Sequence, residues 1–506
     1  MKYKVLSKTN KYLISLLINL GLCNIASSDI IYVHQLASGA GNGLSWNNAF
    51  TDLQSALDIV VPDDTIWVAE GTYRPGVERE NSFTLIDSVV ILGGFMGIET
   101  HHYQRDPEQY SSILSGNIGD SLQIIDNSYH VININYGTIL SSRTKLDGFQ
   151  ISDGNADGDF GSGWGGGLYL GAGSPVISNC IFQNNQAVNG GAIHCGSDSA
   201  SFINLKISDN SASQGGGAVN LSGGTSNKFI NCDFSNNISQ RYGGAIALDL
   251  AHAEFIGCVF FNNIAIEDRG GAISNYTASH PTIINCTFYG NSALQGGSLW
   301  SGGADATIIN SILWGNEPDE IFGGFEISVF YSDIQGGSLG ETNIDENPNF
   351  VNQESGNLRL ADTSPCINTG IDTLIWNTDT LLMLDSASYS GPAPDMGAFE
   401  YYDIVSISPH PELSRKYVLP QNYPNPFNPT TTISYVLPET SEVKLTIFDI
   451  TGRQVANLTD DIQPAGNYDL QWNGIDGNGI QVITGVYFCR LEAGEFSQTI
   501  KMVYLR

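Results

Sequence analysis

Between residues 147 and 316 the chain alternates apolar and polar positions in short runs, and glycine or asparagine interrupts each run. In one such run Ile230, Cys232 and Phe234 alternate with polar residues. A period of two predicts short strands with one buried face, whereas a helical repeat needs a longer apolar stripe with a period near 3.6. The pattern therefore predicts a domain built from many short β-strands.

One phrase recurs through this region. Residues 182–193 read FQNNQAVNGGAI, and related phrases follow at 234–246, 260–273 and 288–299. Successive copies are 25, 27, 26, 28 and 25 residues apart at the marker positions Cys180, Leu205, Cys232, Cys258, Cys286 and Ser311. This period is too short for a propeller blade. Three short strands and three turns consume about this many residues, so each copy is predicted to form one coil of a parallel β-helix.

An asparagine ends the FxxN phrase of every copy. Coils of parallel strands stack about 4.8 Å apart, so equivalent side chains lie above one another. A buried amide needs hydrogen-bond partners, and stacked asparagines can supply them to each other. The predicted inward ladder consists of Asn185, Asn210, Asn237, Asn263, Asn291 and Asn316. The Gly pair that follows in most copies predicts a tight corner.

The chain divides into further segments. Residues 1–28 combine lysines with the apolar run LISLLINLGL, which predicts a secretory signal peptide, with a lipoprotein alternative at Cys23. Residues 29–403 form the predicted passenger, in which the repeats are clearest at 147–316. The stretch 404–416 is a predicted linker, and residues 417–506 alternate as a separate β-sandwich. No run after the signal is apolar for long enough to cross a bilayer.

Composition restricts the partners and the redox chemistry. The 52 acidic and 21 basic residues give a formal net charge of −31, which argues against nucleic acid and anionic membrane surfaces. Cys180 and Cys232 are two coils apart, beyond the reach of a disulfide, and stacked neighbours have unfavourable Cβ directions. We therefore expect buried free thiols rather than a disulfide framework.

Enzymatic chemistry has only weak support in the sequence. A uronate lyase needs acidic Ca²⁺ ligands beside a basic residue, and no acidic cluster recurs beside the few basic residues of 130–345. A glycoside hydrolase needs two paired carboxylates. The nearest candidates are Asp209 with Asp233 and Asp249 with Glu267, and their alternative role is that of solvated surface acids.

One loop resembles the opening of a calcium site. Residues 153–164 read DGNADGDFGSGW, with acidic or amide side chains at alternating positions and a glycine sixth. The candidate ligands are Asp153, Asn155, Asp157 and Asp159. Trp164 occupies the place of the closing glutamate, so a glycine-rich excursion between coils is the alternative. Ca²⁺ is the only cofactor that the sequence suggests.

Five aromatic residues are candidates for stacking on sugars, with core or turn packing as the alternative. They are Trp164, Tyr169, Tyr242, Tyr276 and Trp300. Three histidines share no nucleophile-type partner and are expected at the surface: His194, His252 and His280.

Residues 417–506 resemble the C-terminal sorting domain of proteins exported by the type IX secretion system of Bacteroidota. The matching phrases are NYPNPFNP at 422–429, DITGR at 449–453, AGNYDLQWNGID at 465–476 and TGVYFCRL at 484–491. The resemblance implies contact with the type IX secretion machinery and export across the outer membrane of a Gram-negative bacterium. The mature chain is then expected to be extracellular or held at the cell surface.

Residues 29–403 resemble right-handed β-helix proteins of the pectate-lyase-like superfold, and their GGAI and FxxN phrases are similar to repeats of chlamydial polymorphic outer membrane proteins. The expected fold is therefore all-β: a right-handed parallel β-helix solenoid followed by a small Ig-like β-sandwich. Because this superfold hosts many functions, fold alone decides little. We predict an adhesin-like, glycan-binding or structural protein whose partner is a polysaccharide or a surface protein. A polysaccharide lyase or glycoside hydrolase is the alternative.

Overall fold

The computed structural model describes two separate parts of the chain. The first comprises residues 29–401 except 121–122, 197–198, 225, 277, 324–326, 338–339, 341, 377–378 and 385–387. The second comprises 419, 422, 425, 427, 430–437, 441–450, 452–463, 466–477, 481–494 and 496–504. These parts belong to two compact units, residues 1–402 and 403–506. The predicted signal peptide and linker lie outside the described residues.

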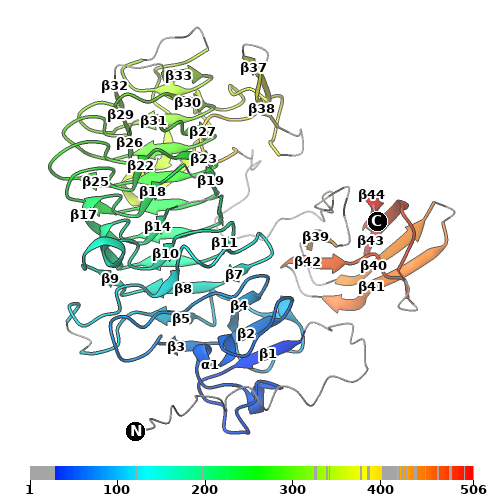
Figure 1. The fold of residues 1–506 in the computed structure, drawn as a ribbon. Coiled ribbons are helices and arrows are strands. Elements are labelled where there is room, and N and C mark those ends of the chain that lie inside the picture. Colours follow the sequence, from blue (N-terminus) through cyan, green and yellow to red (C-terminus); the bar gives the residue numbers. More distant parts are fainter. Residues whose placement is uncertain are drawn as a thin grey trace, which may run out of the picture. The chain divides into compact units, whose positions relative to one another are not determined.

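Parallel sheets run along the first unit, and equivalent strands of successive coils stack above one another (Figure 1). The eleven-stranded sheet contains β1 (Ile30–Val33), β2 (Thr65–Ala69), β4 (Val90–Phe95), β7 (Lys145–Asp147), β11 (Val176–Ser178), β15 (Ser201–Ile203), β19 (Ser226–Ile230), β23 (His252–Ile256), β27 (Thr282–Ile284), β30 (Ala306–Ile309) and β33 (Ile327–Phe330). The ten-stranded sheet contains β3 (Gly71–Tyr73), β5 (Ser112–Ser115), β8 (Phe149–Ser152), β12 (Ile181–Gln183), β16 (Lys206–Ser208), β20 (Asp233–Ser235), β24 (Val259–Phe261), β28 (Thr287–Tyr289), β31 (Ile312–Trp314) and β34 (Asp333–Ile334).

Two further parallel sheets complete the coils. The eight-stranded sheet contains β6 (Ile132–Ile134), β10 (Leu168–Leu170), β14 (Ile193–Cys195), β18 (Val219–Ser222), β22 (Ile246–Asp249), β26 (Ile273–Asn275), β29 (Leu299–Ser301) and β32 (Ile321–Gly323). The five-stranded sheet contains β9 (Asn155–Ala156), β13 (Gln186–Asn189), β17 (Ser211–Gly215), β21 (Ile238–Ser239) and β25 (Ile264–Ala265). Central coils therefore hold four strands. The prediction of three was wrong, because the segment before the Gly pair also joins a ladder.

Stacked side chains fill the interior of the coils. Phe202, Phe229 and Phe255 stack in one column, with ring centroids 4.7 and 5.3 Å apart. Phe234, Phe260 and Phe288 stack in another, at 4.8 and 4.4 Å. These distances follow from the spacing of adjacent strands, because in-register rings repeat at that spacing.

The last two residues of each FxxN phrase adopt different backbone conformations. The first residue is left-handed, with φ of 56° at Asn184 and 55° at Asn236, and glycine takes this position at Gly290 and Gly315. The second residue points inward: Asn185 is fully buried. The doublet therefore turns the chain and then supplies a rung of the ladder.

The two glycines of each pair have different roles. The first, such as Gly243 with φ 60°, adopts the left-handed conformation that glycine tolerates best. The second packs against the backbone of the next coil, since a Cβ on Gly244 would lie 2.1 Å from the Gly271 carbonyl oxygen. Both positions therefore require glycine.

The marker column forms a second ladder at the corner between the ten- and eleven-stranded sheets. The thiol of Cys286 donates to the carbonyl oxygens of Ile284 and Phe255, and its sulfur accepts from the backbone N–H of Cys258. Ser311 accepts from the backbone of Cys286 in the same way, at 3.1 Å. All seven cysteines of the described residues are buried and free. The column therefore suits cysteine or serine, because either side chain can accept a hydrogen bond from the preceding coil and donate to a backbone carbonyl.

Shorter elements cover the coils. Helix α1 (Leu53–Leu57) buries Leu53, Ala56 and Leu57 in the same core cluster as the first strands, and Asp52 caps it by accepting from the Ser55 N–H at 2.8 Å. The 3₁₀ turns are η1 (Trp46–Asn48), η2 (His102–Gln104), η3 (Phe160–Gly163) and η4 (Gln353–Ser355).

Two hairpins after the last coil return over its outer faces. Their strands are β35 (Phe350–Asn352), β36 (Asn357–Leu360), β37 (Thr373–Trp376) and β38 (Asp379–Met383). Leu358 packs with Ile312 of the ten-stranded sheet, and Leu374 packs with Ile309 of the eleven-stranded sheet. The Cys366 thiol donates to Asp333 at 3.2 Å, and burial raises the pKa of Asp333 to about 6.

The second unit is an antiparallel β-sandwich. One sheet pairs β39 (Thr431–Leu437) with β42 (Gly466–Trp472), and the other has the order β41 (Gln454–Gln463), β40 (Ser441–Asp449), β43 (Gly485–Ala493), β44 (Phe496–Tyr504). Six strands of this unit lie within the described residues. Phe427 of the NYPNPFNP phrase is buried, with its ring 5.6 Å from Trp472 and 5.2 Å from Tyr504.

No helix within the described residues has both the length and the apolar character needed to cross a membrane.

Candidate functional site

The six asparagines of the predicted ladder are joined by hydrogen bonds. Each side-chain nitrogen donates to the side-chain oxygen of the next asparagine, over 2.7 to 3.1 Å from Asn185 to Asn316. Each backbone N–H from Asn185 to Asn291 donates to the same oxygen. Because the rungs from Asn185 to Asn291 are no more than 1% exposed, this part of the ladder is a structural element.

A second cluster lies on the outside of the coils, where Arg241 is exposed, Tyr242 and Tyr276 are half-buried, and Trp300 is only 7% exposed. We call it the aromatic–arginine patch, and it consists of Arg241, Tyr242, Asp268, Arg269, Tyr276 and Trp300. Tyr242 and Arg269 are bridged neighbours on adjoining coils, just before their Gly pairs. Tyr276 follows β26 and Trp300 lies on β29, one coil further along. Three of the five sugar-stacking candidates thus lie together.

Arg269 lies at the centre of the patch. Its guanidinium carbon is 4.2 Å from the ring centre of Trp300, 5.2 Å from that of Tyr276 and 5.4 Å from that of Tyr242. The ring centres of Tyr276 and Trp300 are 5.1 Å apart, and those of Tyr242 and Tyr276 are 5.3 Å apart in an edge arrangement. Cation–π contacts of this kind hold the rings and the guanidinium in a fixed arrangement.

Charge within the patch is compensated. Asp268 Oδ1 lies 3.1 Å from Arg269 Nε, and Asp268 Oδ2 lies 3.8 Å from Arg241 Nη2. The exposed side-chain fraction is 48% for Arg241 and 27% for both Asp268 and Arg269. Burial raises the pKa of the Tyr276 hydroxyl, and Arg269 offsets part of the shift. This hydroxyl therefore stays protonated at neutral pH and can both donate and accept hydrogen bonds.

The other two aromatic candidates lie in a closed cluster near the first coils of the eight-stranded sheet. Tyr169 stacks on His194 with ring centres 5.4 Å apart, and Trp164 lies 4.8 Å from the same imidazole. His194 is only 1% exposed, so the expectation that it lies at the surface is wrong. Burial lowers its pKa to about 4. His252 and His280 are exposed and stack at 5.1 Å.

The first acidic pair of the sequence does not form. Lys206, not Asp209, lies opposite Asp233 in the pairing of β16 with β20. Asp209 is left-handed, with φ 57°, and its backbone donates to Ser235 on the next coil. The two aspartates therefore occupy different positions of the coil and do not face each other. Burial raises the pKa of Asp233.

The second acidic pair is divided across a corner. Asp249 ends β22, whose neighbour β26 leads directly into Tyr276. Glu267 immediately precedes Asp268 in the sequence, and its carboxylate accepts a hydrogen bond from the Gln240 side chain at 3.4 Å. Both acids thus flank the aromatic–arginine patch, but neither is the other's hydrogen-bond partner among the described residues.

The predicted calcium loop does not assemble. Asp153 accepts hydrogen bonds from Ser115 and Ser152 at 2.8 and 2.7 Å. Asp157 forms an ion pair with Arg79, whose Nη2 lies 2.7 Å from its Oδ1, so an arginine neutralises this carboxylate. The Asn155 side chain donates to the Ile124 carbonyl oxygen, and Asp159 precedes η3 without capping it. The described residues contain no group of three His, Cys, Asp or Glu that could hold a metal ion.

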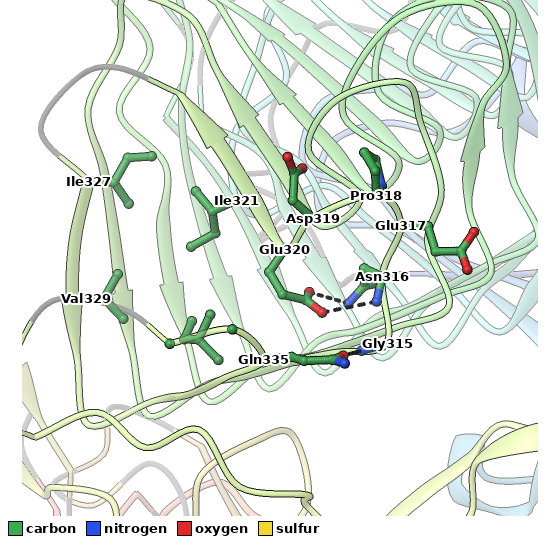
Figure 2. Close-up of a pocket in the computed structure, with 13 residues that line it drawn as sticks. Gly315, Asn316, Glu317, Pro318, Asp319, Glu320, Ile321, Ile327, Val329 and Gln335 are labelled. Atoms are coloured by element: carbon green, nitrogen blue, oxygen red, sulfur yellow. Dashed lines mark hydrogen bonds between the residues drawn. The ribbon is translucent and has the colours of Figure 1, made fainter.

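A hollow of about 670 Å³ lies where the asparagine ladder ends (Figure 2). Its apolar walls include Ile321, Ile327 and Val329. Glu320 takes the place of a further rung, because its carboxylate accepts from the Asn316 N–H at 3.1 Å and from the Asn316 amide at 2.7 Å. Burial raises the pKa of Glu320. The sequence gives no sign of this role, since Glu320 follows Asn316 by only four residues.

The stacked coils and the antiparallel second unit define an all-β protein: a right-handed parallel β-helix followed by a small Ig-like β-sandwich. Residues 141–313 match the family model for the right-handed β-helix region, and residues 427–495 match that for the FlgD Ig-like domain. No curated protein matches the chain.

Three solved structures are similar to parts of the chain. Pectate lyase Pel9A is 16% identical, with a TM-score of 0.47, over 75% of this chain and 98% of its own. The enzymatically active domain of tailspike protein 2 from bacteriophage CBA120 is 12% identical, with a TM-score of 0.31, over 95% of this chain and 76% of its own. PorZ, a surface component of the type IX secretion system of Porphyromonas gingivalis, is 24% identical, with a TM-score of 0.14, over 18% of this chain and 11% of its own.

Proposed function

We propose that this chain is an exported β-helix protein that binds glycan through the aromatic–arginine patch. The observation that carries the proposal is the convergence of Tyr242, Tyr276 and Trp300 around Arg269 on the outside of neighbouring coils. Apolar ring faces beside a few fixed hydrogen-bonding groups are the usual composition of a small-molecule site. Sugars present both apolar C–H faces and hydroxyl groups, so they complement such a surface.

The polar groups of the patch suit hydroxyl ligands. Arg241 offers exposed donors, Asp268 offers acceptors, and the Tyr276 hydroxyl can do both. The patch residues are contributed by successive parallel coils, so their relative positions are set by the bridge between Tyr242 and Arg269 and by the pairing of β26 with β29. Such a fixed arrangement lowers the entropy lost on binding.

Binding, rather than cleavage, is the activity that we propose. A retaining or inverting hydrolase needs two carboxylates facing one bond. Asp209 and Asp233 occupy different positions of the coil, and so do Asp249, at the end of β22, and Glu267, before the Gly pair. An adhesin-like or structural role at the cell surface follows from glycan binding without turnover.

Export is the second part of the proposal. The signal-like segment 1–28, and the resemblance of residues 417–506 to sorting domains of the type IX system, support passage to the outside of a Gram-negative cell. In a host that has this system, removing residues 417–506 should leave the passenger inside the outer membrane. Its appearance at the surface of such cells would contradict this part of the proposal.

Substitution of Tyr276 tests the binding site. We expect Tyr276→Ala to weaken glycan affinity by about 5- to 30-fold, because it removes a ring face and one contact of Arg269, together worth about 1 to 2 kcal/mol. Tyr136→Ala is the matched control, since Tyr136 is 56% exposed and lies outside the patch. Calorimetric titration of the mature chain with a polysaccharide panel gives the affinities.

The same titrations should be accompanied by an assay for newly released sugar ends, with and without Ca²⁺. We expect binding without release. If Tyr276→Ala and Tyr136→Ala bind alike, the patch is not the site. Sugar ends released above a heat-inactivated control would move the function to the enzyme class.

A further inference from the structure

We propose that the ligand of the aromatic–arginine patch is a neutral glycan rather than an acidic one. This inference rests on the proposed function, and it follows from the ion pairs that the charged residues of the patch form with one another. Two arginines at a sugar site would ordinarily indicate a uronate or sulfate ligand, because guanidinium groups pair well with oxyanions. Here both arginines already have partners.

Asp268 is the ion-pair partner of both guanidinium groups, although its contact with Arg269 Nε lacks hydrogen-bond geometry. Its Oδ1 lies 3.1 Å from Arg269 Nε and its Oδ2 lies 3.8 Å from Arg241 Nη2. Asp268 directly precedes Arg269 in the sequence. Arg269 is also covered on the Trp300 side, where its guanidinium carbon lies 4.2 Å from the ring centre. An incoming carboxylate would therefore compete with Asp268 for a guanidinium that is partly buried.

Acidic residues at the border of the patch add to this effect. Glu267 precedes Asp268, and Asp249 lies on the strand beside Tyr276. With these two residues, three carboxylates belong to or adjoin the patch against two guanidinium groups, so the formal charge of this set of residues is negative. A ligand carboxylate held near them would be repelled by their like charge.

The net charge of the whole chain also disfavours an acidic ligand. A formal net charge of −31 produces a negative potential around the molecule, and this field opposes the approach of a polyanion. A neutral polysaccharide encounters no such barrier. Its hydroxyl groups can use the donors of Arg241 and the acceptors of Asp268 without separating the ion pair.

A matched pair of ligands tests the charge preference. Neutral glucan, xylan, galactan and mannan are compared with polygalacturonate and with its fully methyl-esterified form, which has the same backbone without the charge. We expect at least one neutral glycan to bind, with an affinity that changes less than about twofold between low and high salt. Polygalacturonate should bind at least about tenfold more weakly than the esterified form in low salt, and the difference should narrow as salt screens repulsion.

One substitution should reverse the preference. Asp268→Asn keeps the size of the side chain but leaves Arg241 and Arg269 without their carboxylate, so affinity for polygalacturonate should rise at low salt. Tighter binding of the acidic form by the unsubstituted chain, weakening with salt, would overturn the inference and leave glycan binding intact. If no glycan of either charge binds, or if Tyr276→Ala changes nothing, the proposed function itself fails.

Discussion

Replacing Asn237 with leucine lowers the free energy of unfolding by about 3 to 5 kcal/mol, in our expectation. The side-chain oxygen of Asn237 accepts from the Asn210 N–H and the Asn210 amide, both at 3.1 Å, and its nitrogen donates to the Ile207 carbonyl oxygen at 2.8 Å. Leucine has a similar volume but can make none of these bonds. Two buried backbone groups then lose a partner, and each such loss costs about 1 to 3 kcal/mol.

The neighbouring residue supplies the control. Asn236 is exposed and left-handed, with φ 55°, and the equivalent position of two later coils is glycine. Asn236→Gly should therefore change stability by no more than about 0.5 kcal/mol. Urea unfolding followed by far-ultraviolet circular dichroism compares the two variants. Equal stability of Asn237→Leu and Asn236→Gly would show that the ladder does not hold the coils together.

Gly244→Ala should be more damaging still. An added Cβ would lie 2.1 Å from the Gly271 carbonyl oxygen and 2.4 Å from the Ile264 nitrogen. Both are backbone atoms of the next coil, so neither can rotate away, and relief requires the coils to separate locally. We expect a loss of more than about 4 kcal/mol, or failure to fold, because such a clash lies beyond ordinary overpacking.

Gly224→Ala separates steric contact from backbone strain. Gly224 has φ 81°, but an added Cβ would meet nothing within 4 Å. This variant should lose only about 1 to 2 kcal/mol from its left-handed backbone. The midpoints of thermal unfolding of Gly244→Ala and Gly224→Ala distinguish a steric clash from backbone strain. A Gly244→Ala chain as stable as Gly224→Ala would contradict the close packing of coils at this corner.

Much of the β-helix could be predicted from the sequence, because the fold repeats. A residue every 25 to 28 positions marks the same place in each coil, so Asn185 and Asn316 can be assigned to one ladder without coordinates. The fourth strand of the coil is hard to predict because three of its five copies, β9, β21 and β25, are only two residues long and carry no alternation of their own.

The patch could be predicted only in part. Tyr242, Tyr276 and Trp300 are visible as aromatic residues, but they occupy different positions of their copies, so periodicity does not bring them together. Their meeting depends on the corner after the five-stranded sheet, which Arg269 spans. The burial of His194 is hard to predict for a similar reason. Trp164 and Tyr169 cover its imidazole, and the local alternation of apolar and polar residues does not reveal these contacts.

Hydroxyl-radical footprinting with a bound glycan tests the central claim most directly. The mature chain is oxidised alone and with the tightest-binding glycan of the panel, and the rate at each tyrosine is read by mass spectrometry. We predict slower oxidation of Tyr242 and Tyr276 in the complex and no change at Tyr136, which is exposed outside the patch. Protection of Tyr136, with Tyr242 and Tyr276 unchanged, would contradict glycan binding at the aromatic–arginine patch.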